Sequence, residues 1–78
     1  MKTTAFVLVE TNVGKTKDVA KVLRATAAIV SVAIVTGPYD LVVQVEASDV
    51  NAIGRLVTGQ VQSVPGIRRT LTMISTPL

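Results

Sequence analysis

The 78-residue chain contains no cysteine, no histidine and no tryptophan, and its only aromatic residues are Phe6 and Tyr39. Without cysteine or histidine, the sequence offers no thiol nucleophile, no imidazole acid or base, no disulfide framework and no zinc site. The carboxylates are not paired for acid–base catalysis either, since Glu46 and Asp49 straddle the end of a predicted strand and Asp40 stands alone. We therefore expect a protein that is not an enzyme and that uses neither a metal nor a cofactor.

The sequence also lacks a long hydrophobic run. The longest nearly unbroken apolar stretch, residues 27–35, is far shorter than the about 18 residues that a membrane-spanning helix needs. The apolar residues that follow Met1 and Lys2 are too few for a signal-peptide core and lack a small-residue cleavage pattern. These absences predict a cytoplasmic protein without a membrane partner.

Charged residues make up 17% of the chain and hydrophobic residues 49%, which favours a subunit that hides a second face. We expect residues 1–78 to form one domain, and a domain of this size buries only about 60% of its unfolded surface, so self-association is expected to add stability. The net charge of +3 includes four cations in one segment, but no block of five to eight basic residues. We interpret that segment as a solvated helix face, formed by Lys15, Lys17, Lys21 and Arg24.

Runs of β-branched residues alternate along the chain with segments of helical periodicity. Val19, Val22 and Leu23 repeat at helical spacing, and Ser48 and Asp49 are suitable first residues for a second helix. The short segment Gly-Pro-Tyr-Asp at residues 37–40 predicts an antiparallel hairpin. The predicted order is strands at residues 4–10, 29–36, 41–47 and 67–75, with helices at 15–27 and 50–64.

This βαββαβ order predicts an α+β, ferredoxin-like sandwich: a four-stranded antiparallel sheet with two helices on one face. The alternation of residues within the strands predicts a second face that is half apolar and half hydrogen-bonding, and we expect a dimer through this face of the sheet. The residues predicted to face the helices are Leu41, Val43, Val45, Leu71 and Met73, and those predicted to face away are Val42, Gln44, Glu46, Thr70, Thr72 and Ile74.

Other functions of this topology find little support in the sequence. RNA-binding sheets need aromatic side chains on the open face for base stacking, and Tyr39 lies in a turn. Small phosphate-cleaving proteins of this fold need a glycine-rich loop with an arginine after the first strand, whereas residues 11–14 read Thr-Asn-Val-Gly. The aliphatic interior also argues against a monooxygenase.

Residues 34–45, Ile-Val-Thr-Gly-Pro-Tyr-Asp-Leu-Val-Val-Gln-Val, resemble the signature hairpin of the effector-binding and oligomerisation domain of the Lrp/AsnC transcription regulators. Residues 64–72, Val-Pro-Gly-Ile-Arg-Arg-Thr-Leu-Thr, resemble the end of that domain's second helix and its last strand. The resemblance covers about residues 4–76. Full-length regulators of this family carry an N-terminal helix-turn-helix domain, whereas this chain begins at the first strand, so we expect a stand-alone domain without direct DNA binding.

The resemblance implies dimers, their assembly into rings that are often octamers, and a pocket for an amino-acid effector between dimers. It also implies mixed assembly with full-length Lrp/AsnC regulators. Backbone N–H groups of a turn can hold a carboxylate, a carboxylate such as Asp40 can accept from an ammonium group, and threonine hydroxyls can complete the set. The implied ligand residues are Thr36, Gly37, Tyr39, Asp40, Thr70 and Thr72.

Structural explanations remain open for these residues. Gly37 and Pro38 suit a hairpin turn, Asp40 can bond to the turn backbone, and Tyr39 can fill a subunit contact. Arg68 and Arg69 are interpreted as rim charges or intersubunit pairs rather than ligand groups. Two alternative functions also stay open. The chain could be a purely structural partner in hetero-oligomers that binds no ligand, or an amino-acid-binding module of the ACT type.

Overall fold

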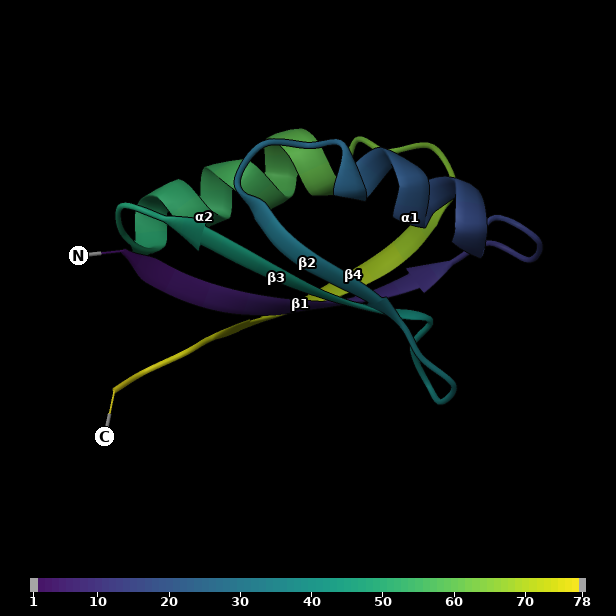
Figure 1. Ribbon diagram of the computed structural model, residues 1–78, viewed down its shortest axis with the longest axis horizontal. Helices are drawn as coiled ribbons and strands as arrows, with labels where there is room; N and C mark the ends of the chain where they lie inside the picture. Colours follow the sequence, from purple (N-terminus) through teal and green to yellow (C-terminus); the bar gives the residue numbers. More distant parts are fainter. Residues whose placement is uncertain (1, 78) are drawn as a thin grey trace.

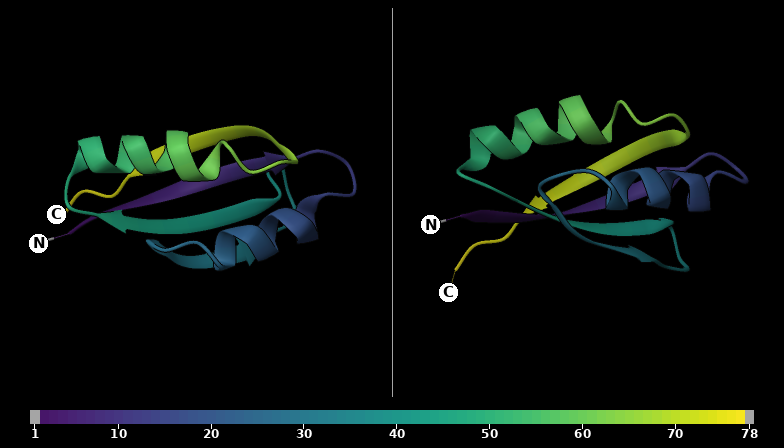
Figure 2. Two further views of the ribbon diagram at one scale, coloured as in Figure 1. Left: turned by 90° about the horizontal axis from the view of Figure 1, so that it is seen from above. Right: turned by 45° about the horizontal axis from the view of Figure 1, so that its top comes forward.

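The computed structural model describes residues 2–77, in which the four strands and two helices follow one another in the predicted order. The sheet is antiparallel throughout, with strand order β2-β3-β1-β4. Both helices lie on one face of it and leave the other face without a layer (Figures 1 and 2). The elements are β1 (Thr3–Thr11), α1 (Thr16–Arg24), β2 (Ile29–Ile34), β3 (Leu41–Ala47), α2 (Val50–Leu56), the π-helical turn η1 (Val57–Val61) and β4 (Ile67–Ile74).

Helix α1 packs on the sheet through Val19, Ala20 and Leu23, which are buried. The prediction that Val22 belongs to this buried stripe is wrong, because Val22 is 48% exposed. Successive residues of an α-helix are about 100° apart around the axis, so turning Leu23 to the sheet points Val22 to the side. The basic residues of the helix are exposed, as the sequence predicts.

Helix α2 begins where Asp49 caps it, since the Asp49 carboxylate accepts a hydrogen bond of 2.8 Å from the Ala52 N–H. The first residue, Val50, is 57% exposed and not part of the buried stripe. The helix then widens into η1, in which the Gln62 N–H donates to the Val57 carbonyl over 2.8 Å. This one-residue widening keeps Val57 and Val61 both buried against the sheet.

The hydrophobic core lies between the helices and the face of the sheet that they cover. Leu41, Val43 and Val45 of β3 are fully buried there, which confirms the orientation predicted for this strand. The remaining core residues are Ala5, Val7, Val9, Val19, Ala20, Leu23, Ile53, Leu56, Val57, Val61 and Val64.

The helices that cover this core are short. Within residues 2–77, no helix is long and apolar enough to cross a membrane.

The orientation predicted for β4 is wrong. Leu71 pairs with Leu8 and Met73 with Phe6, so both side chains share the face of β1 opposite to its buried residues. By the same register, Thr70, Thr72 and Ile74 lie on the helix-covered side, opposite Val9, Val7 and Ala5. Strand β4 is an edge strand, so even these residues keep some exposure to solvent.

The open face of the sheet therefore carries two cross-strand rows. One row, Ala33, Val42, Leu8 and Leu71, is entirely apolar, and the other, Ser31, Gln44, Phe6 and Met73, is half polar. Phe6, Leu71 and Met73 are 36%, 47% and 46% exposed. Three large apolar side chains thus lie uncovered on a surface with no helix over it.

Candidate functional site

The turn between β2 and β3 is tied to the end of β1 by Asp40. Its Oδ2 accepts hydrogen bonds from the Thr11 N–H at 2.8 Å and from the Thr11 hydroxyl at 3.1 Å. The Thr11 hydroxyl also lies 2.7 Å from that of Thr16 at the start of α1. Since Thr11 is buried, Asp40 supplies an acceptor that this part of the core requires. The Oδ2 atom of Asp40 therefore stabilises the fold by accepting these two hydrogen bonds.

The backbone of the turn leaves fewer free donors than the sequence suggests. The Asp40 N–H donates to the Val9 carbonyl at 2.9 Å, and the Val35 N–H donates to the Asp40 carbonyl at 2.9 Å. Pro38 has no N–H. The N–H groups of Gly37 and Tyr39 make no backbone hydrogen bond within residues 2–77. These two N–H groups could bind an anion.

Gly37 is not required by the fold of the single chain. Its φ is not positive, and a Cβ added to it would meet nothing within 4 Å. Thr36 and Gly37 are exposed, whereas Tyr39 is partly buried. A side chain at residue 37 would therefore be disfavoured only by something outside this chain, such as a second subunit or a ligand.

The two threonines of the implied site lie on another strand. Val9 pairs on one side with Leu41, the first residue after the turn, and on the other side with Thr70. Two strand spacings of about 4.8 Å thus separate Thr70 from the end of the turn, and Thr72 lies further along β4. The structure places the turn residues together and the threonines together, in two groups within one chain.

A cluster of charges lies between these groups, and its carboxylate, Glu10, was not singled out from the sequence. Glu10 contacts two arginines, Arg68 through Nε at 3.3 Å and Arg69 through a terminal nitrogen at 3.3 Å. The Arg69 guanidinium also lies over the Tyr39 ring, 5.9 Å from its centre. These arginines, interpreted from the sequence as rim charges or intersubunit pairs, form an ion pair within their own chain. The sequence feature that could have indicated this cluster is the pair of adjacent arginines in a predicted strand, where neighbouring side chains should point to opposite faces.

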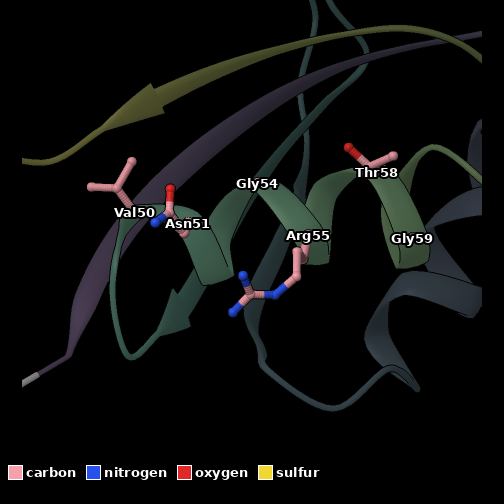
Figure 3. A pocket seen from close by; sticks show the side chains of 6 residues that line it. All are labelled: Val50, Asn51, Gly54, Arg55, Thr58 and Gly59. Atoms are coloured by element: carbon pink, nitrogen blue, oxygen red, sulfur yellow. The ribbon is translucent and has the colours of Figure 1, made fainter.

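A depression of about 350 Å³ adjoins this cluster at the edge of β4. Its lining combines the two arginines with a polar pair, in which the Gln62 amide donates to the Thr70 hydroxyl at 3.0 Å. A second, more open groove lies along the outer surface of α2 and η1 and contains none of the implied ligand residues (Figure 3). Residues 2–77 hold no group of three acidic side chains placed to bind a metal ion.

A family model for the Lrp/AsnC ligand binding domain matches residues 4–76. The chain belongs to the Lrp/AsnC ligand-binding domain family. This Lrp/AsnC domain is 34% identical over 76 residues to the Pyrococcus horikoshii protein named uncharacterized HTH-type transcriptional regulator PH1916. The match covers 94% of this chain and 51% of that protein, so the chain spans about half the length of the curated relatives it matches.

Solved structures agree with this assignment. The crystal structure of FFRP-DM1 matches with a TM-score of 0.90 and 34% identity, over 95% of this Lrp/AsnC domain and 99% of that chain. The complex of the Neisseria meningitidis transcriptional regulator NMB0573 with L-Met matches with a TM-score of 0.86, over 96% of this chain and 50% of that one. At 21% identity, the second likeness shows the fold alone.

Proposed function

We propose that this Lrp/AsnC domain is a regulatory module rather than an enzyme. It pairs with a second copy through the open face of its sheet, and the dimers associate further into an octamer-like ring. A small effector, an amino acid, binds at the contacts that assembly creates. The domain acts in the cytoplasm and passes the state of the effector to DNA by mixed assembly with full-length regulators.

The observation that carries this proposal is the composition of the open face. Phe6, Leu71 and Met73 together form an uncovered apolar surface, and a domain this small gains stability when such a surface is buried. A second copy related by a twofold axis would cover these residues with their own counterparts, since such an interface is self-complementary. Pairing in this way would join two four-stranded sheets face to face.

The effector role is supported by the family and by the turn. The family model is that of a ligand-binding domain, and the regulator NMB0573, which has the same fold, was solved as a complex with L-Met. In this chain, the Gly37 and Tyr39 N–H groups make no backbone hydrogen bond within the described residues, and they can hold the carboxylate of an amino acid. An effector shifts assembly only if it binds one assembly state more tightly than another.

A calorimetric screen of the twenty amino acids tests the effector role. We expect heat of binding, or a higher midpoint of thermal unfolding at millimolar ligand, with at least one of them. Gly37→Leu is expected to abolish that heat without changing the stability of the fold, because residue 37 has open space around it within the chain. Gly54→Leu is the matched control, since Gly54 also has nothing within 4 Å of an added Cβ but lies on α2. No heat and no thermal shift with any amino acid would refute the effector role.

A second candidate is a structural partner that forms mixed oligomers with helix-turn-helix relatives and binds no ligand. The observation in its favour is that Asp40 Oδ2 is already occupied by Thr11, so the turn has a purely structural explanation. Co-purification with such a relative, unchanged by the variant Asp40→Asn and by every amino acid, would favour this candidate.

A further inference from the structure

Two arginines converge on one carboxylate at the end of the sheet. In a regular strand, adjacent side chains point to opposite faces, so Arg68 and Arg69 should not reach the same partner. The register between β1 and β4 shifts here, because Glu10 pairs with Arg69 and Thr11 pairs with Ile67. Arg68 is the extra residue of this β-bulge, and bulges redirect side chains next to binding sites. The bulge brings both guanidinium groups to Glu10.

Glu10 neutralises only one of the two positive charges and accepts from only some of the guanidinium N–H groups. Its side chain is 22% exposed, whereas those of Arg68 and Arg69 are 71% and 65% exposed. Each arginine contacts Glu10 through one nitrogen, and a guanidinium has five N–H donors arranged to bind a carboxylate through two of them. One negative charge between two positive charges leaves one positive charge and several donors for an anion.

The surroundings of the pair combine polar groups with one apolar side chain, that of Ile67. The adjoining depression of about 350 Å³ lies at the lower end of the range of about 300–1,000 Å³ that small-molecule pockets occupy. Besides the arginines, Gln62 and Thr70 line it. Arg69 also contacts the Tyr39 ring, which connects the site to the turn between β2 and β3.

We propose that Arg68 and Arg69 bind the side-chain carboxylate of the effector, which is therefore a dicarboxylic amino acid such as L-glutamate or L-aspartate. This inference rests on the proposed effector role of the turn, where the α-carboxylate is held by the backbone. The single uncompensated positive charge matches a carboxylate, which carries one negative charge, better than a phosphate, which carries nearly two. Glu10 acts as a positioning residue, because it holds the two guanidinium groups on the same side.

The test compares L-glutamate with L-glutamine, which have nearly the same shape and differ in one charge. By titration calorimetry we expect L-glutamate to bind about tenfold more tightly or better, since hydrogen bonds between charged groups are roughly twice as strong as neutral ones. The double variant Arg68→Gln/Arg69→Gln is expected to remove this preference. The matched control is Lys17→Gln/Lys21→Gln, which removes the same charge from α1 and should leave the preference intact. Both pairs are exposed, so both variants are expected to fold.

Each outcome decides between the two levels of the proposal. If L-glutamine or another neutral amino acid binds as tightly as L-glutamate, the arginine site is refuted and the effector role of the domain remains. If the two variants reduce the preference equally, the effect is one of overall charge and the arginine site is also refuted. If no amino acid gives heat, the effector role fails and the arginine site fails with it.

Discussion

Gly66 is the residue at which the structure predicts the largest effect of adding a single methyl group. It lies between η1 and β4 with φ of 98°, and a Cβ built on it would lie 3.0 Å from Lys15 Cβ and 3.0 Å from Val19 Cγ2. Its carbonyl also accepts a hydrogen bond of 2.8 Å from the Asn12 N–H. Gly66→Ala therefore combines backbone strain with a collision against α1.

The two costs can be separated with a second glycine. A non-glycine residue in the left-handed region costs about 1–2 kcal/mol, and forcing an extra carbon into a packed site costs about 1–3 kcal/mol more. Gly14 has φ of 80° and nothing within 4 Å of an added Cβ, so Gly14→Ala carries only the first cost. We expect Gly66→Ala to lower the free energy of unfolding by about 2–5 kcal/mol and Gly14→Ala by about 1–2 kcal/mol.

Urea unfolding followed by circular dichroism measures both variants, at one protein concentration so that any contribution of assembly is shared. The difference between the two variants reports the contact of residue 66 with Lys15 and Val19. Equal losses of stability in the two variants would mean that Lys15 and Val19 do not approach residue 66 as closely as described, and the reasoning would be refuted.

Three further predictions concern local energetics. Ala28 has φ of 73°, so Ala28→Gly should raise the free energy of unfolding by about 0.5–1 kcal/mol in the same urea assay, and a loss would contradict the assigned backbone. Asp40→Ala should cost about 1–3 kcal/mol, because it leaves the buried Thr11 groups without their acceptor. Asp40→Asn should recover most of that loss in a thermal melt, whereas equal losses would show that charge matters more than the acceptor. Leu23→Ala should lower the free energy of unfolding by about 2–5 kcal/mol. Val22→Ala should change it little, because Val22 is 48% exposed. Similar losses in the two variants would mean that Val22 is part of the core.

The order of the elements and most of the core could be predicted from the sequence, because residues 43–46 of β3 alternate valine with a polar residue and α2 begins at a strong capping residue. Strand β4 could not be oriented in this way. Its residues 70–73 alternate threonine with apolar residues, and the open face of this sheet is itself largely apolar, so hydrophobicity does not distinguish the two faces. Strand β1, its partner, is apolar on both faces as well. A shift of register by one residue exchanges the faces, and the register depends on a bulge that the sequence does not mark.

The candidate site was predictable only in part, for a similar reason. The turn residues adjoin one another in the sequence, so their proximity needs no tertiary information. The convergence of Glu10 with Arg68 and Arg69 joins residues far apart in the chain and depends on the bulge. The role of Asp40 as acceptor for the buried Thr11 likewise depends on the packing of the turn against β1.

The central claim is that a second copy of this chain covers the open face of the sheet, and the molar mass in solution tests it most directly. Size-exclusion chromatography with light scattering at micromolar concentration should give a dimer or a larger even multiple of 8.2 kDa. Met73→Lys should shift the mass towards the monomer, because Met73 lies on the open face, whereas Val22→Lys, with a similar exposed fraction on α1, should keep the pairing of the sheets. A monodisperse 8.2 kDa species for the unmodified chain would contradict the account.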